Sequence, residues 1–288
     1  MSPPLSAATL LGDVPPHTTA FFREVLAALQ AAGIPFAVGG AFAQACLTGI
    51  QRVTRDLDLF MRRADWERAR ARMESAGWRA ELAYPHWLAK VHAGSDFVDL
   101  IFNSGNGLAP VDEGWFEGNL EVDLLGVRVR IANAEDSILS KAFIMERERF
   151  DGADVAHLLQ ARAERIDWPS LLRRFGPHWR VLLAHLSLFG FIYPAERQRL
   201  PAWLLEELAA RLVDEARQPP ADATRVCAGT LLSREQYLDD VTRQGYVDAR
   251  LLPGGMMRPE DVAAWTRAIP QRVSGSGSGS GSGPGPGA

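Results

Sequence analysis

The sequence contains few residues of the kind that hold small disulfide-rich or zinc-stabilised proteins together. Its 288 residues include two cysteines, Cys46 and Cys227, which lie far apart and outside any histidine-containing ligand motif. A disulfide framework or a structural zinc site needs more cysteines at closer spacing. We therefore expect both thiols to be small core side chains.

Long apolar runs are also missing. Residues 1–17 have no basic segment, and their apolar stretch is too short for a signal peptide or a membrane span. The composition, 47% hydrophobic and 23% charged, is typical of a globular protein with one or two cores. We expect a cytoplasmic protein without a membrane partner.

An excess of positive charge is missing as well. The chain has 31 basic and 35 acidic residues, and both halves, divided at Asn133, are slightly acidic. Proteins that bind long nucleic acid usually present a positive stripe, so we do not expect long duplex DNA as a partner. Lys90 and Lys141 are the only lysines. This preference for arginine makes the number of arginines uninformative about function.

The most informative stretch of the chain begins at a pair of glycines. The apolar run 34–38 ends at Gly39-Gly40, and residues 41–48 have a helical pattern. Glycine allows the backbone to approach a ligand and to adopt positive φ, and the helix that follows offers free N–H groups. A strand-to-helix turn of this kind suits a phosphate group.

Two carboxylates follow in the short strand 56–60. Alternation places Asp56 and Asp58 on one face and the intervening leucines on the other. Like charges this close repel unless a cation lies between them, and Mg²⁺ is a hard ion that prefers oxygen ligands. The plainer alternative is a solvated face balanced by Arg52 and Arg55.

A third acid, Asp99, interrupts the otherwise apolar strand 97–103. If that strand lies beside 56–60, three carboxylates converge next to the glycine turn, as a two-metal site requires. Asp123, in the strand 121–124, is the rival for the third position. A core ion pair with an arginine is the plainer role for Asp99.

In combination these motifs resemble a known group of proteins. Gly39-Gly40, the segment 52–58 (RVTRDLD) and the Asp99 strand are similar to the polymerase-β-like nucleotidyltransferases. The resemblance is to their small prokaryotic branch, which includes AbiEii-like toxins and aminoglycoside nucleotidyltransferases, and it covers residues 36–160.

The resemblance also implies roles for residues outside the three acids. Arg52 and Thr54 would touch the nucleotide, although both also suit a turn that is only capped and paired locally. Lys141 would hold the triphosphate from the start of the helical region, with a solvated helix lysine as the alternative. Downstream, Asp151 and Asp154 match family acids that follow this lysine, although Asp151 also suits a helix cap.

Periodicity predicts an α/β (α+β) fold, a nucleotidyltransferase-like mixed sheet with flanking helices followed by a helical domain. The domains are 1–133 (catalytic), 134–273 (helical) and a flexible Gly/Ser/Pro tail at 274–288. Besides 34–38, 56–60 and 97–103, strands are expected at 78–82 and 87–92 and a hairpin at 120–125 and 127–131. Helices are expected at 18–32, 41–48, 66–76, 135–149, 155–163, 168–175, 179–191, 201–217 and 234–244.

The activity that the resemblance implies is transfer of a nucleoside monophosphate from an NTP to an acceptor hydroxyl, with Mg²⁺ or Mn²⁺ as cofactor. The sequence leaves the acceptor open among a small molecule, a protein and a compact RNA. One alternative is a toxin that modifies tRNA and has an antitoxin partner. The other is a non-enzymatic nucleotide-binding or interaction module.

Overall fold

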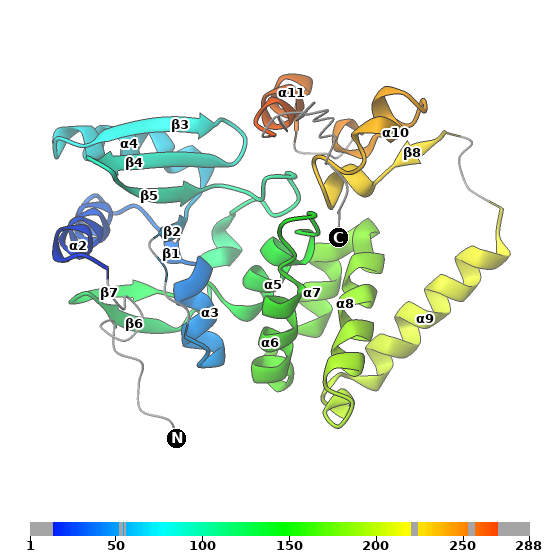
Figure 1. Ribbon diagram of the computed structural model, residues 1–288. Coiled ribbons are helices and arrows are strands. Elements are labelled where there is room, and N and C mark those ends of the chain that lie inside the picture. The colour runs from blue at the N-terminus through cyan, green and yellow to red at the C-terminus, as the bar shows by residue number, and fades with distance from the viewer. Residues whose placement is uncertain (1–13, 52–53, 55, 220–223, 253–256, 270–288) are drawn as a thin grey trace, which may run out of the picture.

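The computed structural model describes residues 14–51, 54, 56–219, 224–252 and 257–269. Its main sheet has five strands in the order β1-β2-β5-β4-β3 (Figure 1). Only β2 and β5 are parallel within this sheet, and the other neighbours are antiparallel. The strands are β1 (Ala37–Val38), β2 (Leu57–Phe60), β3 (Arg79–Tyr84), β4 (Leu88–Ala93) and β5 (Asp96–Ile101). The expected mixed α/β fold is confirmed.

Alternation along these strands gives the sheet two unlike faces. The apolar side chains of one face are fully buried, and they belong to the first hydrophobic core together with side chains of α2 (Pro16–Ala31) and α4 (Trp66–Ser75). The buried members from the three central strands are Leu57, Leu59, Ala89, Val91, Val98 and Leu100. The opposite face carries charged side chains, which form the site described below.

Two further elements adjoin β1. Helix α3 (Gly40–Thr48) joins β1 to β2 and ends at Gly49, whose φ of 77° is the left-handed conformation that favours glycine. A separate hairpin of β6 (Glu121–Leu124) and β7 (Val127–Arg130) connects to β1 through a bridge between Val38 and Ile131.

A second hydrophobic core lies among the helices that follow the hairpin. These helices are α5 (Ala134–Ala142), α6 (Gly152–Arg162), α7 (Trp168–Phe175), α8 (Trp179–Ile192) and α9 (Ala202–Arg217). The second core also includes Leu47, Phe60 and Trp115 from the first part of the chain. This core contains residues from both sides of Asn133. The division into two domains at that residue stays a prediction.

The helix expected over 135–149 is too long. Helix α5 ends at Ala142, and the chain then reverses through a bridge between Met145 and Phe150. Met145 N–H donates to the backbone oxygen of Leu232, 3.1 Å away, instead of continuing the helix. Contacts with a distant segment thus override the helical propensity of this stretch.

The C-terminal region also differs from expectation. The helix expected at 234–244 is reduced to α10 (Leu238–Thr242), because a turn capped by the Ser233 hydroxyl precedes it. A short parallel pair, β8 (Val226–Cys227) and β9 (Val247–Asp248), and helix α11 (Pro259–Arg267) were not predicted. Figure 1 shows α11 beside β3, where Trp265 packs edge-on against Tyr84 at 4.8 Å between ring centroids.

The remaining regular structure consists of short 3₁₀ turns. They lie at Arg63–Asp65, Glu113–Phe116, Ala163–Arg165, Gly176–His178, Arg197–Arg199, Gly229–Leu231 and Ala249–Leu251. In the part of the chain that the structure describes, no helix is long and apolar enough to cross a membrane. Both cysteines are free thiols and partly exposed, so the expectation of core positions holds only in part: Cys46 packs against the first core.

Candidate functional site

The site centres on the pairing of β2 with β5. Their parallel register sets Asp58 directly beside Asp99, with Leu57 beside Val98 and Leu59 beside Leu100. Because directly paired residues point to the same face of a sheet, the two carboxylates share the polar face. The condition set by the sequence, that the two acid-bearing strands lie side by side, is therefore met.

The glycine turn lies against Asp58. Gly39 N–H donates to the backbone oxygen of Asp58 at 2.9 Å, and α3 begins at Gly40, whose φ is 53°. A Cβ atom at Gly40 would lie 1.7 Å from Asp58 Oδ2, and one at Gly39 would lie 2.0 Å from the ring of Phe60. Only glycine allows the turn to approach the carboxylate this closely.

The electrostatics of Asp58 are unfavourable for a charged carboxylate. Burial raises its pKa to about 6, and repulsion from Asp99 and then Asp56 adds to the rise. Lys141 and Arg149 lie close enough to oppose it. Burial also raises the pKa of Asp99, against the hydrogen bond and charge of Lys90. The three acids thus act on one another and lack a full set of counter-charges.

Asp56 and Thr54 lie in the segment that precedes β2. Asp56 is exposed, and its backbone N–H donates to the Thr54 hydroxyl, which in turn donates to the Asp56 backbone oxygen at 3.1 Å. This is the local turn that was one of the two roles considered for Thr54. Arg52, predicted at the nucleotide, lies outside the described residues, as do Val53 and Arg55.

A second cluster of charges faces Asp58 from α5, α6 and the loop between them. Lys141 Nζ donates to Asp154 Oδ2 at 2.8 Å and lies 3.4 Å from Asp151 Oδ2. Arg149 donates to both oxygens of Asp151, at 2.9 and 2.8 Å. Burial opposes ionisation of Asp151, but these two cations together keep its pKa below the usual value.

This cluster is tied to the glycine turn through α3. The Gln44 side-chain amide donates to the backbone oxygen of Asp154 at 3.1 Å. The structure thus places Lys141, Asp151 and Asp154 together, next to the carboxylates. Arg149 was not singled out in the sequence, although it lies in the segment 146–154, which resembles a family segment where a basic residue and aspartates follow this lysine.

Lys90 is a second residue that sequence reasoning missed. It lies on β4 opposite Asp99 in antiparallel register, and its Nζ donates to Asp99 Oδ1 at 2.6 Å. The alternation of β4, with Ala89 and Val91 buried, was the signal that placed Lys90 on the polar face.

Asp123, the rival third acid, lies elsewhere. It belongs to the separate β6–β7 hairpin, where its Oδ1 accepts a hydrogen bond from Gly126 N–H at 2.9 Å. It closes a turn there, and of the two candidates only Asp99 pairs with Asp58.

The donor atoms of this site are of the chemical type that a divalent cation prefers. Asp58 and Asp99 provide hard oxygen donors of like charge on adjacent strands, and Gly40 leaves the Asp58 carboxylate uncovered by a side chain. Among residues 14–269, where the structure describes them, no three His, Cys, Asp or Glu side chains already converge on one point as metal ligands.

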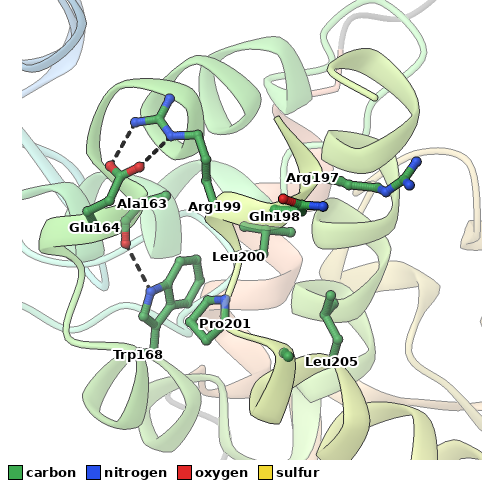
Figure 2. A pocket seen from close by; sticks show the side chains of 10 residues that line it. Ala163, Glu164, Trp168, Arg197, Gln198, Arg199, Leu200, Pro201 and Leu205 are labelled. Atoms are coloured by element: carbon green, nitrogen blue, oxygen red, sulfur yellow. Dashed lines mark hydrogen bonds and ion pairs between the residues drawn. The ribbon is translucent and has the colours of Figure 1, made fainter. Parts of the chain in front are cut away.

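Two cavities lie outside this site. One, of about 640 Å³, is bounded by the end of α6, α7 and the start of α9, and in Figure 2 an Arg199–Glu164 ion pair lies at its edge. The other, of about 600 Å³, lies between residues 112–135 and the Arg162–Arg174 region. Neither is lined by the carboxylates or by the glycine turn.

Several solved structures are similar to the chain at low identity. They include the lincomycin-bound lincosamide antibiotic adenylyltransferase LnuA (14% identity, 52% of this chain, 99% of that chain, TM-score 0.35). A second is ANT(2")-Ia in complex with adenylyl-2"-tobramycin (18% identity, 68% of this chain, 99% of that chain, TM-score 0.33). A third is an antigenic nucleotidyltransferase-like protein from Paracoccidioides brasiliensis (12% identity, 63% of this chain, 91% of that chain, TM-score 0.42). All three TM-scores lie below 0.5, so they carry no argument about function.

The sequence itself gives the family. No curated protein sequence matches the chain. A family model described as uncharacterised nucleotidyltransferase matches residues 18–181, which is more than half of the chain and includes the glycine turn, all three carboxylates and Lys141. The expected resemblance to nucleotidyltransferases is thereby confirmed, and the chain belongs to this nucleotidyltransferase family.

Proposed function

We propose that the protein transfers a nucleoside monophosphate from an NTP to an acceptor hydroxyl at the site formed by Asp58, Asp99 and the glycine turn. The observation that carries this proposal is the parallel pairing of β2 with β5, which sets Asp58 beside Asp99 and against Gly40. Membership of a nucleotidyltransferase family indicates an enzyme of this general class. The metal and the role of each residue are proposed from the family resemblance and the chemistry of the site, and the acceptor stays open among a small molecule, a protein and a compact RNA.

In this proposal Asp56, Asp58 and Asp99 hold Mg²⁺, with Mn²⁺ as the alternative, in a two-metal arrangement. The bound ions would neutralise the triphosphate and stabilise the charge that develops on the attacking and leaving oxygens. The raised pKa values of Asp58 and Asp99 fit this role, because a divalent ion offsets the burial and the repulsion between acids that raise them.

The protein's own residues position the reactants. The backbone of Gly39 and Gly40, at the start of α3, would contact the phosphates, and Lys141 and Arg149 would supply positive charge close to Asp58. The acceptor oxygen attacks the α-phosphorus, the bond to pyrophosphate breaks, and Asp99 takes the hydroxyl proton. Arg52 and Thr54 complete the nucleotide contacts in this proposal.

An acceptor screen tests the proposal. NTPs labelled at the α-phosphate are incubated with the protein, Mg²⁺ and cell extract, and the label is followed into small molecules, proteins and RNA. We expect transfer that requires the metal and is lost in Asp58→Ala. Label confined to tRNA would favour the toxin alternative with an antitoxin partner, and NTP binding without transfer to any fraction would favour the non-enzymatic module.

Long duplex DNA is not the proposed acceptor. The chain carries more acids than basic residues, so few backbone phosphates are neutralised at once. Fluorescence anisotropy with random duplex DNA should show only weak binding at about 150 mM salt. Sub-micromolar affinity with a steep salt dependence would contradict this choice of acceptor and leave the NTP site untouched.

A further inference from the structure

The two lysines of this arginine-rich chain both contact acids of the candidate site. Lys141 contacts Asp154 and Asp151, whereas Lys90 lies on the sheet itself, with its Nζ 2.6 Å from Asp99 Oδ1. The same Nζ lies 3.9 Å from the ring centroid of Phe97. A carboxylate and an aromatic face together hold this ammonium group in place.

Lys90 belongs to a row of charged residues across the sheet. Asp58 pairs with Asp99, Asp99 with Lys90, and Lys90 with Glu81 on β3. Directly paired residues share a face, so the order of charges along the row is negative, negative, positive, negative. A cation already hydrogen-bonds to Asp99. The cations that act on Asp58, Lys141 and Arg149, make their hydrogen bonds to Asp154 and Asp151 instead.

We propose that the Lys90 ammonium is an internal cation that competes with a divalent ion for Asp99. The first ion binds at the Asp56–Asp58 end, and a second ion binds only by displacing Lys90. Glu81 lies opposite Lys90 in the strand register, and this carboxylate, which now pairs with Arg79 and His92, is where the displaced ammonium would move. Lys90 thereby sets the metal concentration at which the site fills, an inference that rests on the proposed metal-dependent function.

A purely structural Lys90 makes a different prediction. If Lys90 only held β4 against β5, its removal would lower the stability of the fold and leave metal affinity unchanged, or weaken it through a misplaced Asp99. Competition predicts the opposite sign for metal affinity. Metal binding measured without turnover separates the two roles.

The test is Mn²⁺ binding to the full chain in the presence of a non-hydrolysable NTP analogue, with free Mn²⁺ measured by electron paramagnetic resonance. The variants are Lys90→Met and Lys90→Gln, which remove the charge, and Lys90→Arg, which keeps it. Arg128→Met is the matched control, since Arg128 is an exposed strand cation that pairs with Glu121 in the separate β6–β7 hairpin. Thermal unfolding of each variant shows whether it is folded. If Lys90→Met does not fold, Lys90→Gln provides the test.

We expect the second Mn²⁺ to bind about tenfold or more tightly in the charge-removing variants, from the strength of a hydrogen bond between charged groups. Lys90→Arg and Arg128→Met should match the wild type. Equal or weaker second-ion affinity in both charge-removing variants would overturn the inference while leaving the metal site intact. Absence of Mn²⁺ binding in every variant would instead overturn the metal site of the proposed function, and this inference with it.

Discussion

Asp58 and Asp136 have pKa values raised to about 6, in both cases chiefly by burial, yet their surroundings differ. Asp136 lies on α5, is fully buried and pairs with Arg174. The nearest acids to Asp58 are Asp99 and Asp56, and both raise its pKa further. A perturbed pKa therefore identifies a buried acid, whereas the sign of the neighbouring charges shows where an external cation is needed.

Cations near the two acids are also used differently. Arg174 forms an ion pair with Asp136, which makes that pair locally neutral. Lys141 and Arg149 act on Asp58 but make their hydrogen bonds to Asp154 and Asp151. We infer that the Asp136 pair serves the stability of the helical region and the Asp58 cluster serves a ligand.

The largest expected effect is a loss of NTP binding when the carboxylate of Asp58 is removed. Asp58→Ala should weaken Mg²⁺-dependent NTP binding by about 10³-fold, or about 4 kcal/mol, in a protein that stays folded. Asp123→Asn is the control, because an asparagine oxygen can still accept the hydrogen bond from Gly126. Calorimetric titration with NTP measures both, and wild-type affinity in folded Asp58→Ala would exclude the site.

The second prediction concerns Asp136. Arg174→Met leaves a buried carboxylate without its partner, which should cost about 3 kcal/mol of the free energy of unfolding. Urea unfolding measures this loss, and NTP binding per folded molecule should not change. If the variant lost nucleotide affinity while keeping its stability, the assignment of the two acids would be reversed.

A third comparison uses two glycines at the ends of α3. Gly40 and Gly49 both have positive φ, but a Cβ would collide with Asp58 only at Gly40, and nothing lies within 4 Å at Gly49. Gly49→Ala should cost about 1 kcal/mol, from backbone strain alone. Gly40→Ala should cost about 2 kcal/mol or more and also weaken NTP binding, because Asp58 must move. Equal effects of the two substitutions on stability and NTP affinity would make the turn structural only.

The fourth prediction is a gain in stability. Because the pKa of Asp58 is raised in the folded state to about 6 from a usual value of 3.8, ionisation favours the unfolded chain, and stability falls as pH rises between these values. Asp58→Asn, measured in EDTA, should therefore be more stable than wild type above about pH 6, by about 1 to 3 kcal/mol. Below about pH 4 the gain should vanish, and a pH-independent difference would argue against the crowding of these acids.

Local patterns predicted much of this architecture. Alternation identified the sheet strands and placed Asp56 and Asp58 on one face, and the glycine pair marked the turn before α3. Asp99 joins this face only through the pairing of β5 with β2. The same alternation put Lys90 on that face, but only the strand order brought it to Asp99, and strand order depends on contacts distant in sequence. The premature end of α5 depends on Leu232, far along the chain, so local propensity misses it.

The most direct test of the central claim is anomalous diffraction at the manganese edge, from crystals of the protein with Mn²⁺ and a non-hydrolysable NTP analogue. We expect manganese peaks in contact with Asp58 and Asp99, with the triphosphate against Gly39 and Gly40. A well-ordered nucleotide bound elsewhere, with no manganese on either carboxylate, would contradict it.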